Sequence, residues 1–108
     1  MNVLKHIVMW KFKDDAEGNT KARNMDLVSR RLRSLIGVVP SLIDLTIGQD
    51  VLHSSASFDM GLICTFQDID GMLAYRDHPA HREISEFIAR VTYDRVTADF
   101  YVDAADNT

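Results

Sequence analysis

The spacing of apolar residues changes period several times along the chain, and the order of these changes restricts the folds that it can adopt. Alternation at every second residue is typical of a strand, whereas recurrence at every third and fourth residue is typical of an amphipathic helix. The alternating segments are also rich in β-branched and aromatic residues, which strands favour. The predicted strands cover residues 4–12, 41–51, 57–66 and 92–102, and the predicted helical regions cover residues 21–36 and 67–91.

The resulting order, strand–helix–strand–strand–helix–strand, predicts an α+β protein with the ferredoxin-like split βαβ (βαββαβ) plan. In this plan a four-stranded antiparallel sheet carries its helices on one face. The length of 108 residues suits one domain. We therefore expect a single ferredoxin-like domain over residues 1–103, followed by a flexible C-terminal tail at residues 104–108.

Proline and glycine residues mark where the helical regions end. Gly37 is expected to cap the first helix, and Pro40 prevents its continuation. Pro79 lies inside the second helical region, where it cannot donate a backbone hydrogen bond and disfavours helix at His78. Because proline suits the first turn of a helix, we expect a short helix, a kink and then a longer helix.

Apolar residues occur on both faces of the predicted sheet. Alternation in the first strand separates His6, Val8, Trp10 and Phe12 from Lys5, Ile7, Met9 and Lys11. The second of these sets is partly apolar, and the next strand adds Ile43, Leu45 and Ile47. Because the helices cover only one face, an exposed apolar face of this size marks an interface. A second copy packed sheet to sheet would cover it, so we expect a homodimer through the open sheet face.

Composition argues against several classes of function. The formal net charge is −4, whereas nucleic-acid-binding domains normally carry a basic surplus, and the cluster Arg30, Arg31 and Arg33 fits a solvated helix face. No apolar run approaches the roughly 18 residues of a membrane span, and the first residues do not read as a signal peptide. The single cysteine, Cys64, fits a buried position in a reducing compartment. We therefore expect a cytoplasmic protein that binds neither nucleic acid nor membrane.

The stretch AYRDHPAH, residues 74–81, gathers residues that can carry out proton chemistry. It contains Tyr75 and two of the four histidines, His78 and His81. Histidine is the usual general base near neutral pH, because its unperturbed pKa is about 6.5, and a tyrosine hydroxyl can orient a carbonyl group. Three uses are open to this stretch: a metal site, an acid–base site, or a polar helix start.

The metal site is the least favoured of these uses. HPAH offers His78 and His81 as ligands three residues apart, and Asp77, Glu83 or His6 could complete a set. Zinc takes three or four ligands, and only two have a clear spacing here. Glycine-rich phosphate loops and a serine elbow are also absent from the sequence. The sequence therefore predicts no metal and no cofactor.

Three segments resemble one family over nearly the whole chain. KHIVMWKFK, GQDVLHSSASFDMGLICTFQDIDGMLAYRDHPAH and RVTADFYV are similar to the stress-responsive α/β barrel (Dabb) domain family, which includes olivetolic-acid-cyclase-like polyketide cyclases. The resemblance implies a dimeric α/β barrel in which two ferredoxin-like sheets face each other. In the cyclase branch, a tyrosine and a histidine between sheet and helices close a poly-β-keto thioester by aldol condensation. By motif match, the resemblance implies that the candidate catalytic residues are His6, Tyr75 and His81.

These assignments lead to two alternative functions. In the first, a homodimer holds a small-molecule pocket between sheet and helices and acts on a carbonyl compound as a polyketide cyclase or lyase. His81 is then the base, Tyr75 orients the carbonyl, and His6 is a polar wall or second proton carrier, while Trp10 and His78 contact the ligand. In the second, a non-catalytic stress-response or structural dimer uses HPAH only to support the fold. The residues leave open whether the chain is an enzyme, and the segment at residues 82–91 is more polar than in the cyclase branch.

Overall fold

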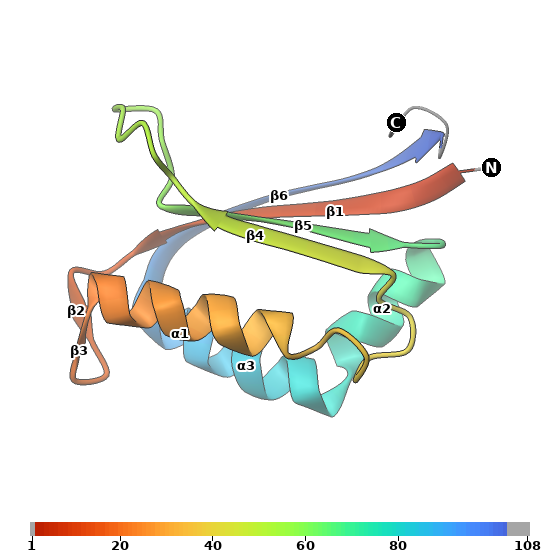
Figure 1. Ribbon diagram of the computed structural model, residues 1–108, viewed down its shortest axis with the longest axis horizontal. Helices are drawn as coiled ribbons and strands as arrows, with labels where there is room; N and C mark the ends of the chain where they lie inside the picture. Colours follow the sequence, from red (N-terminus) through yellow and green to blue (C-terminus); the bar gives the residue numbers. More distant parts are fainter. Residues whose placement is uncertain (1, 104–108) are drawn as a thin grey trace.

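A computed structural model describes residues 2–103, and its main elements follow the predicted order (Figure 1). The strands are β1 (Asn2–Phe12), β2 (Asp15–Ala16), β3 (Asn19–Thr20), β4 (Asp44–Gln49), β5 (Met60–Phe66) and β6 (Thr92–Asp103). The helices are α1 (Lys21–Arg33), α2 (Ile69–Asp77) and α3 (Pro79–Val91). None of these helices combines the length and the hydropathy that crossing a bilayer requires. The tail predicted at residues 104–108 lies outside the described residues.

The long strands form one antiparallel sheet in the order β4–β5–β1–β6, which confirms the ferredoxin-like α+β prediction. α1, α2 and α3 all lie on the same side of this sheet (Figure 1). β1 runs between β5 and β6, and its His6 pairs with Cys64 of β5 and with Asp99 of β6. Because directly opposed residues project to the same face, these three side chains belong to the helix-facing side.

Two predicted boundaries differ in the structure. α1 ends at Arg33 rather than at residue 36, because the chain tightens there into i→i+3 hydrogen bonds, such as Leu35 N–H to the Leu32 carbonyl at 3.1 Å. Ser34 is the capping residue, and Gly37, the predicted cap, adopts a φ of +84° within the turns that follow. β4 and β5 are shorter than predicted, so the connection between them spans residues 50–59.

A small hairpin, β2–β3, is an element that the sequence did not predict. Its two turn residues, Glu17 and Gly18, have φ values of 53° and 74°, which is the left-handed geometry that a two-residue hairpin turn needs. The buried Asn24 of α1 fastens this hairpin, because its Nδ2 donates to the Ala16 carbonyl at 3.0 Å and its Oδ1 accepts from Asn19 Nδ2 at 3.2 Å. The hairpin thus depends on a tertiary contact as well as on its turn.

The core lies between the sheet and the helices. The strands contribute Leu4, Val8, Trp10, Phe12, Leu45, Ile47, Met60, Leu62, Cys64 and Phe66. The helices contribute Val28, Leu32, Tyr75, Ile84, Phe87, Ile88 and Val91. Burial of Cys64 agrees with the sequence prediction, and it raises the pKa of this thiol to about 12, so the residue is a neutral hydrophobe at physiological pH.

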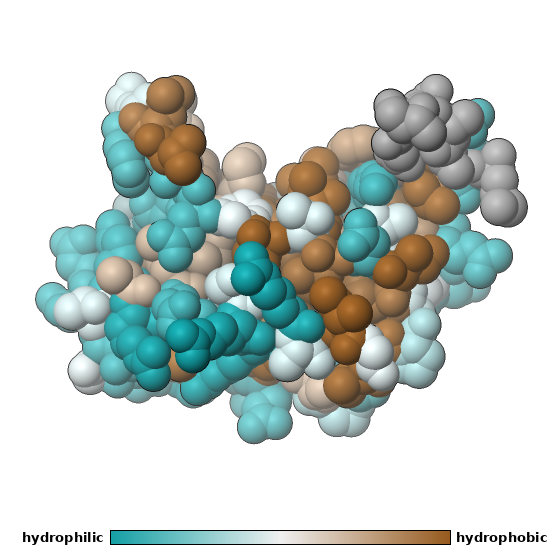
Figure 2. All heavy atoms as spheres, viewed as in Figure 1, coloured by the Kyte–Doolittle hydropathy of each residue, from teal (hydrophilic) through white to brown (hydrophobic). Residues whose placement is uncertain are grey.

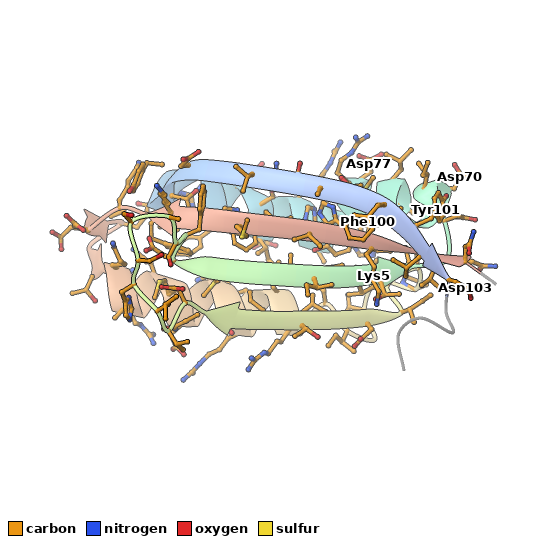
Figure 3. All side chains as sticks on the ribbon, turned by 90° about the horizontal axis from the view of Figure 1, so that it is seen from above. Lys5, Asp70, Asp77, Phe100, Tyr101 and Asp103 are labelled. Carbon is orange, nitrogen blue, oxygen red and sulfur yellow. The ribbon has the colours of Figure 1, made fainter. Side chains whose placement is uncertain are left out.

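On the opposite face of the sheet, which we call the open face, there is no helix among the described residues. Ile63, Val96 and Phe100 are 42%, 39% and 45% exposed there, and Figure 3 looks onto this face with Phe100 and Lys5 in view. Leu45 and Ile47 do not contribute to it as predicted, because the register of β4 turns them toward the helices and leaves Thr46 beside Ile63. The open face is therefore apolar chiefly over β1, β5 and β6.

The β4–β5 connection rises on the open side of the sheet (Figure 1). Its tip exposes Val51 and Leu52, which are 89% and 77% accessible, and hydrophobic residues are visible there in Figure 2. An apolar loop tip and the open face of the sheet thus lie on the same side of the molecule.

Candidate functional site

The fold brings together the three residues proposed for catalysis on the helix-facing side of the sheet. His6 comes from β1, Tyr75 from α2 and His81 from the first turns of α3. The rings of Tyr75 and His81 have centroids 4.3 Å apart, and the His6 ring lies 6.5 Å from the Tyr75 ring. Residues 6 and 81 thus flank one phenol, although they are far apart in sequence. We call these three residues the triad.

The corner between α2 and α3 determines where His81 lies. Pro79 occupies the first turn of α3, and His78 ends α2 and also caps α3, with its Nδ1 accepting from the Ala80 N–H at 3.1 Å. Because this capping contact occupies Nδ1, only Nε2 of His78 is free to meet a ligand. The role of His78 as a ligand contact therefore stays a prediction.

His81 is held as a neutral base. Its Nδ1 lies 3.1 Å from the carbonyl oxygen of Arg76. A carbonyl can only accept, so Nδ1 carries the proton and Nε2 presents its lone pair. Burial lowers the pKa of His81, and electrostatic interactions with His6 and Arg95 act in the same direction, whereas the hydrogen bond to the Arg76 carbonyl and the charge of Asp77 oppose them. The ring is consequently neutral at physiological pH.

Tyr75 is held as a neutral phenol. Its side chain is 1% exposed and packs against the Phe66 ring at a centroid distance of 5.1 Å. Burial raises the pKa of Tyr75 well above its usual value. Cys64 Sγ donates to the phenol oxygen at 3.9 Å, a contact that leaves the proton of the phenol itself uncommitted. Tyr75 can therefore serve as a hydrogen-bond donor but not as a phenolate.

Asp99 is a member of the site that sequence reasoning did not single out. Its Oδ1 lies 2.5 Å from Nδ1 of His6, and the two residues face each other across the β1–β6 ladder. A carboxylate accepts, so the Nδ1 of His6 donates and its Nε2 points away from Asp99. The alternation of β6 contained the signal, since it puts Asp99 in one row with Tyr93, Arg95, Thr97 and Tyr101.

Trp10 lies on the same face of β1, two register positions beyond Val8. It is 3% exposed, and its Nε1 has no hydrogen-bond partner among the described residues. Arg95 is its directly opposed neighbour on β6. Trp10 thus lies on the same strand and the same face as His6. Its contact with a ligand stays a prediction.

Three surface hollows occur elsewhere on the described part of the chain. They measure about 570 Å³ between α1 and α3, about 370 Å³ beside Val3 and Ile43, and about 290 Å³ beside Met9 and Phe58. None of these three is lined by the triad, so the ligand pocket predicted between sheet and helices stays a prediction. Within residues 2–103, no group of three or more histidine, cysteine or acidic side chains could hold a metal ion.

Comparison with known proteins identifies the family. The model of the Stress responsive A/B Barrel Domain matches residues 4–102, and the chain belongs to this family. A stress-response A/B barrel domain-containing protein of Arabidopsis thaliana is 27% identical over 108 residues, which cover 97% of this chain and 91% of the relative.

Solved structures share the fold. A dimeric ferredoxin-like protein from Thermobifida fusca has a TM-score of 0.80 and 26% identity, with 94% of this chain and 92% of the other covered. The hydroxynitrile lyase of Passiflora edulis also has a TM-score of 0.80, at 15% identity, with 94% and 96% covered. Structural relatives of this chain thus include a dimer and an enzyme.

Proposed function

We propose that this stress-responsive A/B barrel protein is a homodimer that binds a small carbonyl compound at the triad and acts on it by acid–base chemistry of the cyclase or lyase type. The observation that carries the proposal is the state of His81. Its Nδ1 proton is held by the Arg76 carbonyl and its pKa is lowered, so Nε2 is a free base beside a phenol. General bases work best in this neutral form near the pH of the reaction.

The proposed reaction begins with enolisation. His81 Nε2 accepts a proton from the carbon next to the carbonyl, and the electron pair of that C–H bond forms the enolate. Tyr75 donates its phenol proton in a hydrogen bond to the developing oxyanion. In an aldol closure, the enolate carbon attacks a second carbonyl, and the new alkoxide takes back the proton from His81. In a lyase reaction, the enolate re-forms its C=O bond, a C=C bond forms to the next carbon, and the leaving group departs from that carbon with the bonding electron pair and takes up the proton. His6, oriented by Asp99, is the second proton carrier.

The homodimer is proposed to form through the open face. Ile63, Val96 and Phe100 are partly exposed on it, and an apolar surface of this kind is uncommon on a monomer. A two-fold axis would bring the same face of a second copy onto it. The triad lies on the other side of the sheet, so each subunit keeps its own site.

A non-catalytic structural dimer is the second candidate, and the burial of Tyr75 favours it. A phenol that is 1% exposed and in contact with Phe66 and Cys64 belongs to the core. In this case His81 would serve only to join the two helices through the Arg76 carbonyl. The two candidates differ in whether a ketone reaches His81 Nε2.

Exchange of the α-proton of a ketone distinguishes the catalytic dimer from the structural dimer. The protein is incubated with apolar methyl ketones in D₂O, and loss of the α-proton signal is followed by NMR. Wild-type protein should accelerate exchange, and His81→Ala should slow it by about a hundredfold, which is a typical contribution of a general base. Tyr75→Phe, which keeps the ring, should also slow it.

His53→Ala is the matched control, because His53 lies in the exposed β4–β5 connection, away from the triad. This variant should accelerate exchange of the ketone α-proton as much as wild-type protein does. A wild-type protein without acceleration, or a His81→Ala variant with the full rate, would support the structural dimer instead.

A further inference from the structure

Within residues 2–103, two side-chain hydrogen-bond donors that have no acceptor lie side by side near the triad. The Nε1–H of Trp10 is buried and has no partner among residues 2–103. Arg95 stands directly opposite Trp10 in the β1–β6 ladder, so the two side chains are neighbours on the helix-facing side. Arg95 is exposed, and within the same residues its guanidinium makes no hydrogen bond or ion pair, whereas its backbone N–H donates to Asp94 Oδ1 at 2.8 Å.

An unpaired donor in the core requires an explanation. Leaving a buried polar group without a partner costs about 1–3 kcal/mol, so most such groups are satisfied by protein, water or ligand. The Arg95 guanidinium, which has no partner among the described residues, adds a second and stronger donor beside it, and its planar fork matches a carboxylate in two-point contact. Together, Trp10 and Arg95 offer donors and a positive charge and no acceptor.

The Trp10–Arg95 pair lies at one end of a row of β6 side chains, and Asp99, the partner of His6, lies further along the same row. Arg95 and Asp99 lie four residues apart in one row of β6, which is about 13 Å along a strand. The charge of Arg95 nevertheless reaches both Tyr75 and His81, since it lowers the pKa of each. Asp99 is engaged by His6, so the negative charge of the row lies at one end and its positive charge at the other.

We propose that Arg95 and Trp10 form an anion subsite that binds the carboxylate of the ligand, and that the ligand is therefore an oxo acid whose ketone reaches the triad. This inference rests on the proposed function for the ketone end, whereas the carboxylate end rests on Arg95 and Trp10. It also defines a polarity of binding. The acid lies toward the α3–β6 junction, and the carbonyl lies toward His6 and His81.

The test uses binding of three small probes. They are 5-oxohexanoate, its methyl ester, and hexanoate, which lacks the ketone. Trp10 is the single tryptophan of the chain, so its fluorescence reports on ligand at the subsite, and calorimetry gives an independent dissociation constant. Wild-type protein should bind 5-oxohexanoate at least about tenfold more tightly than the methyl ester, as expected for loss of a hydrogen bond to a charged group.

Substitutions of Arg95 and Trp10 then test whether these two residues cause the preference for the acid over the methyl ester. Arg95→Gln should remove the preference for the acid over the ester, and Arg95→Lys should restore part of it. Trp10→Phe, measured by calorimetry, should weaken binding of the acid more than binding of the ester. Arg23→Gln is the matched control, because Arg23 is exposed on α1 and pairs with Asp26.

The outcomes separate this inference from the proposed function. Equal affinity for acid and ester in wild-type protein, no carboxylate-dependent binding at millimolar probe, or an acid preference that persists in Arg95→Gln would overturn the anion subsite. If hexanoate binds as tightly as 5-oxohexanoate and depends on Arg95, the subsite stands and the ketone chemistry fails. If the methyl ester binds as tightly as the acid and its binding depends on His81 but not on Arg95, the ketone site stands and the anion subsite fails.

Discussion

The rings of Tyr75 and His81 lie 4.3 Å apart at an angle of 46°, although they belong to different helices. α2 ends before Pro79 and α3 begins with it, so the chain turns a corner between the two residues. On one continuous helix, residues six apart would not share a face, because neighbours recur at three and four. The corner thus folds the His81 ring back onto Tyr75 and lets its Nδ1 reach the Arg76 carbonyl.

The lowered pKa of His81 predicts a loss of stability in acid. Below the unfolded pKa of about 6.5, the unfolded chain binds a proton at this ring more readily than the folded chain does, so the free energy of unfolding falls as the pH falls. Urea unfolding should show that the free energy of unfolding falls less between about pH 7.5 and about pH 5 in His81→Gln than in wild-type protein. Equal losses would contradict the assignment.

Tyr75 is predicted to stabilise the fold mainly through its ring. Tyr75→Phe removes only a 3.9 Å contact with Cys64 and should cost less than about 1.5 kcal/mol, whereas Tyr75→Ala empties a fully buried site and should cost about 3–5 kcal/mol. Denaturant titrations with unchanged m-values measure both. A Tyr75→Phe variant as unstable as Tyr75→Ala would mean that the hydroxyl is a structural group rather than a donor available to a ligand.

We expect the apolar open face to hold a homodimer together, and one charged substitution on it to disrupt the dimer. Light scattering should give wild-type protein a mass of about twice 12.2 kDa. Ile63→Lys places a charge in the centre of the open face and should yield a monomer. Ile36→Lys is the matched control, because Ile36 has a similar exposure, 52% against 42%, but lies in the turn after α1. A dimer that survives Ile63→Lys would place the interface elsewhere.

Asn24 is predicted to be the principal fastening of the β2–β3 hairpin. Asn24→Ala removes a buried amide and leaves the partly buried Ala16 carbonyl without its donor, which should cost about 1–3 kcal/mol. Asn19→Ala, which removes only the second hydrogen bond of this amide, should cost less. Hydrogen exchange should show faster opening of residues 15–20 in the first variant. Unchanged exchange there would show that the Glu17–Gly18 turn is sufficient.

The helix cap at His78 is the last testable feature. His78→Ala removes the Nδ1 acceptor of the Ala80 N–H and should destabilise the protein by about 1 kcal/mol, whereas His78→Asn, which keeps a side-chain acceptor, should be nearly neutral. Chemical denaturation compares the two. If both variants lose the same stability, then packing of the imidazole, and not capping, is its contribution.

The sequence predicted the fold through features that act locally. Strand alternation put His6 and Trp10 on one face of the first strand and Lys5 on the other, as the ladder has them, and Pro79 marked the break between α2 and α3. Where local signals were weak, prediction was less accurate. The end of α1 depends on i→i+3 turns rather than on a glycine cap, and β2–β3 is too short to show a period.

The site was predictable only in part. His6, Tyr75 and His81 were predicted as candidates by motif match, but a motif does not state whether a phenol is buried or which nitrogen carries a proton. Asp99 and Arg95 were overlooked, because each looks like an ordinary polar residue of an edge strand until β6 is paired with β1.

The sequence by itself determined the order of the elements, the faces of the strands and the break at Pro79, because these follow from side-chain period and backbone chemistry within a few residues. Only the tertiary structure decided that His81 lies against Tyr75, that Asp99 orients His6, and that Arg95 stands beside Trp10, whose Nε1 has no partner within residues 2–103. Those relationships join residues up to 93 positions apart, and they arise from strand register and helix packing, which no local pattern encodes.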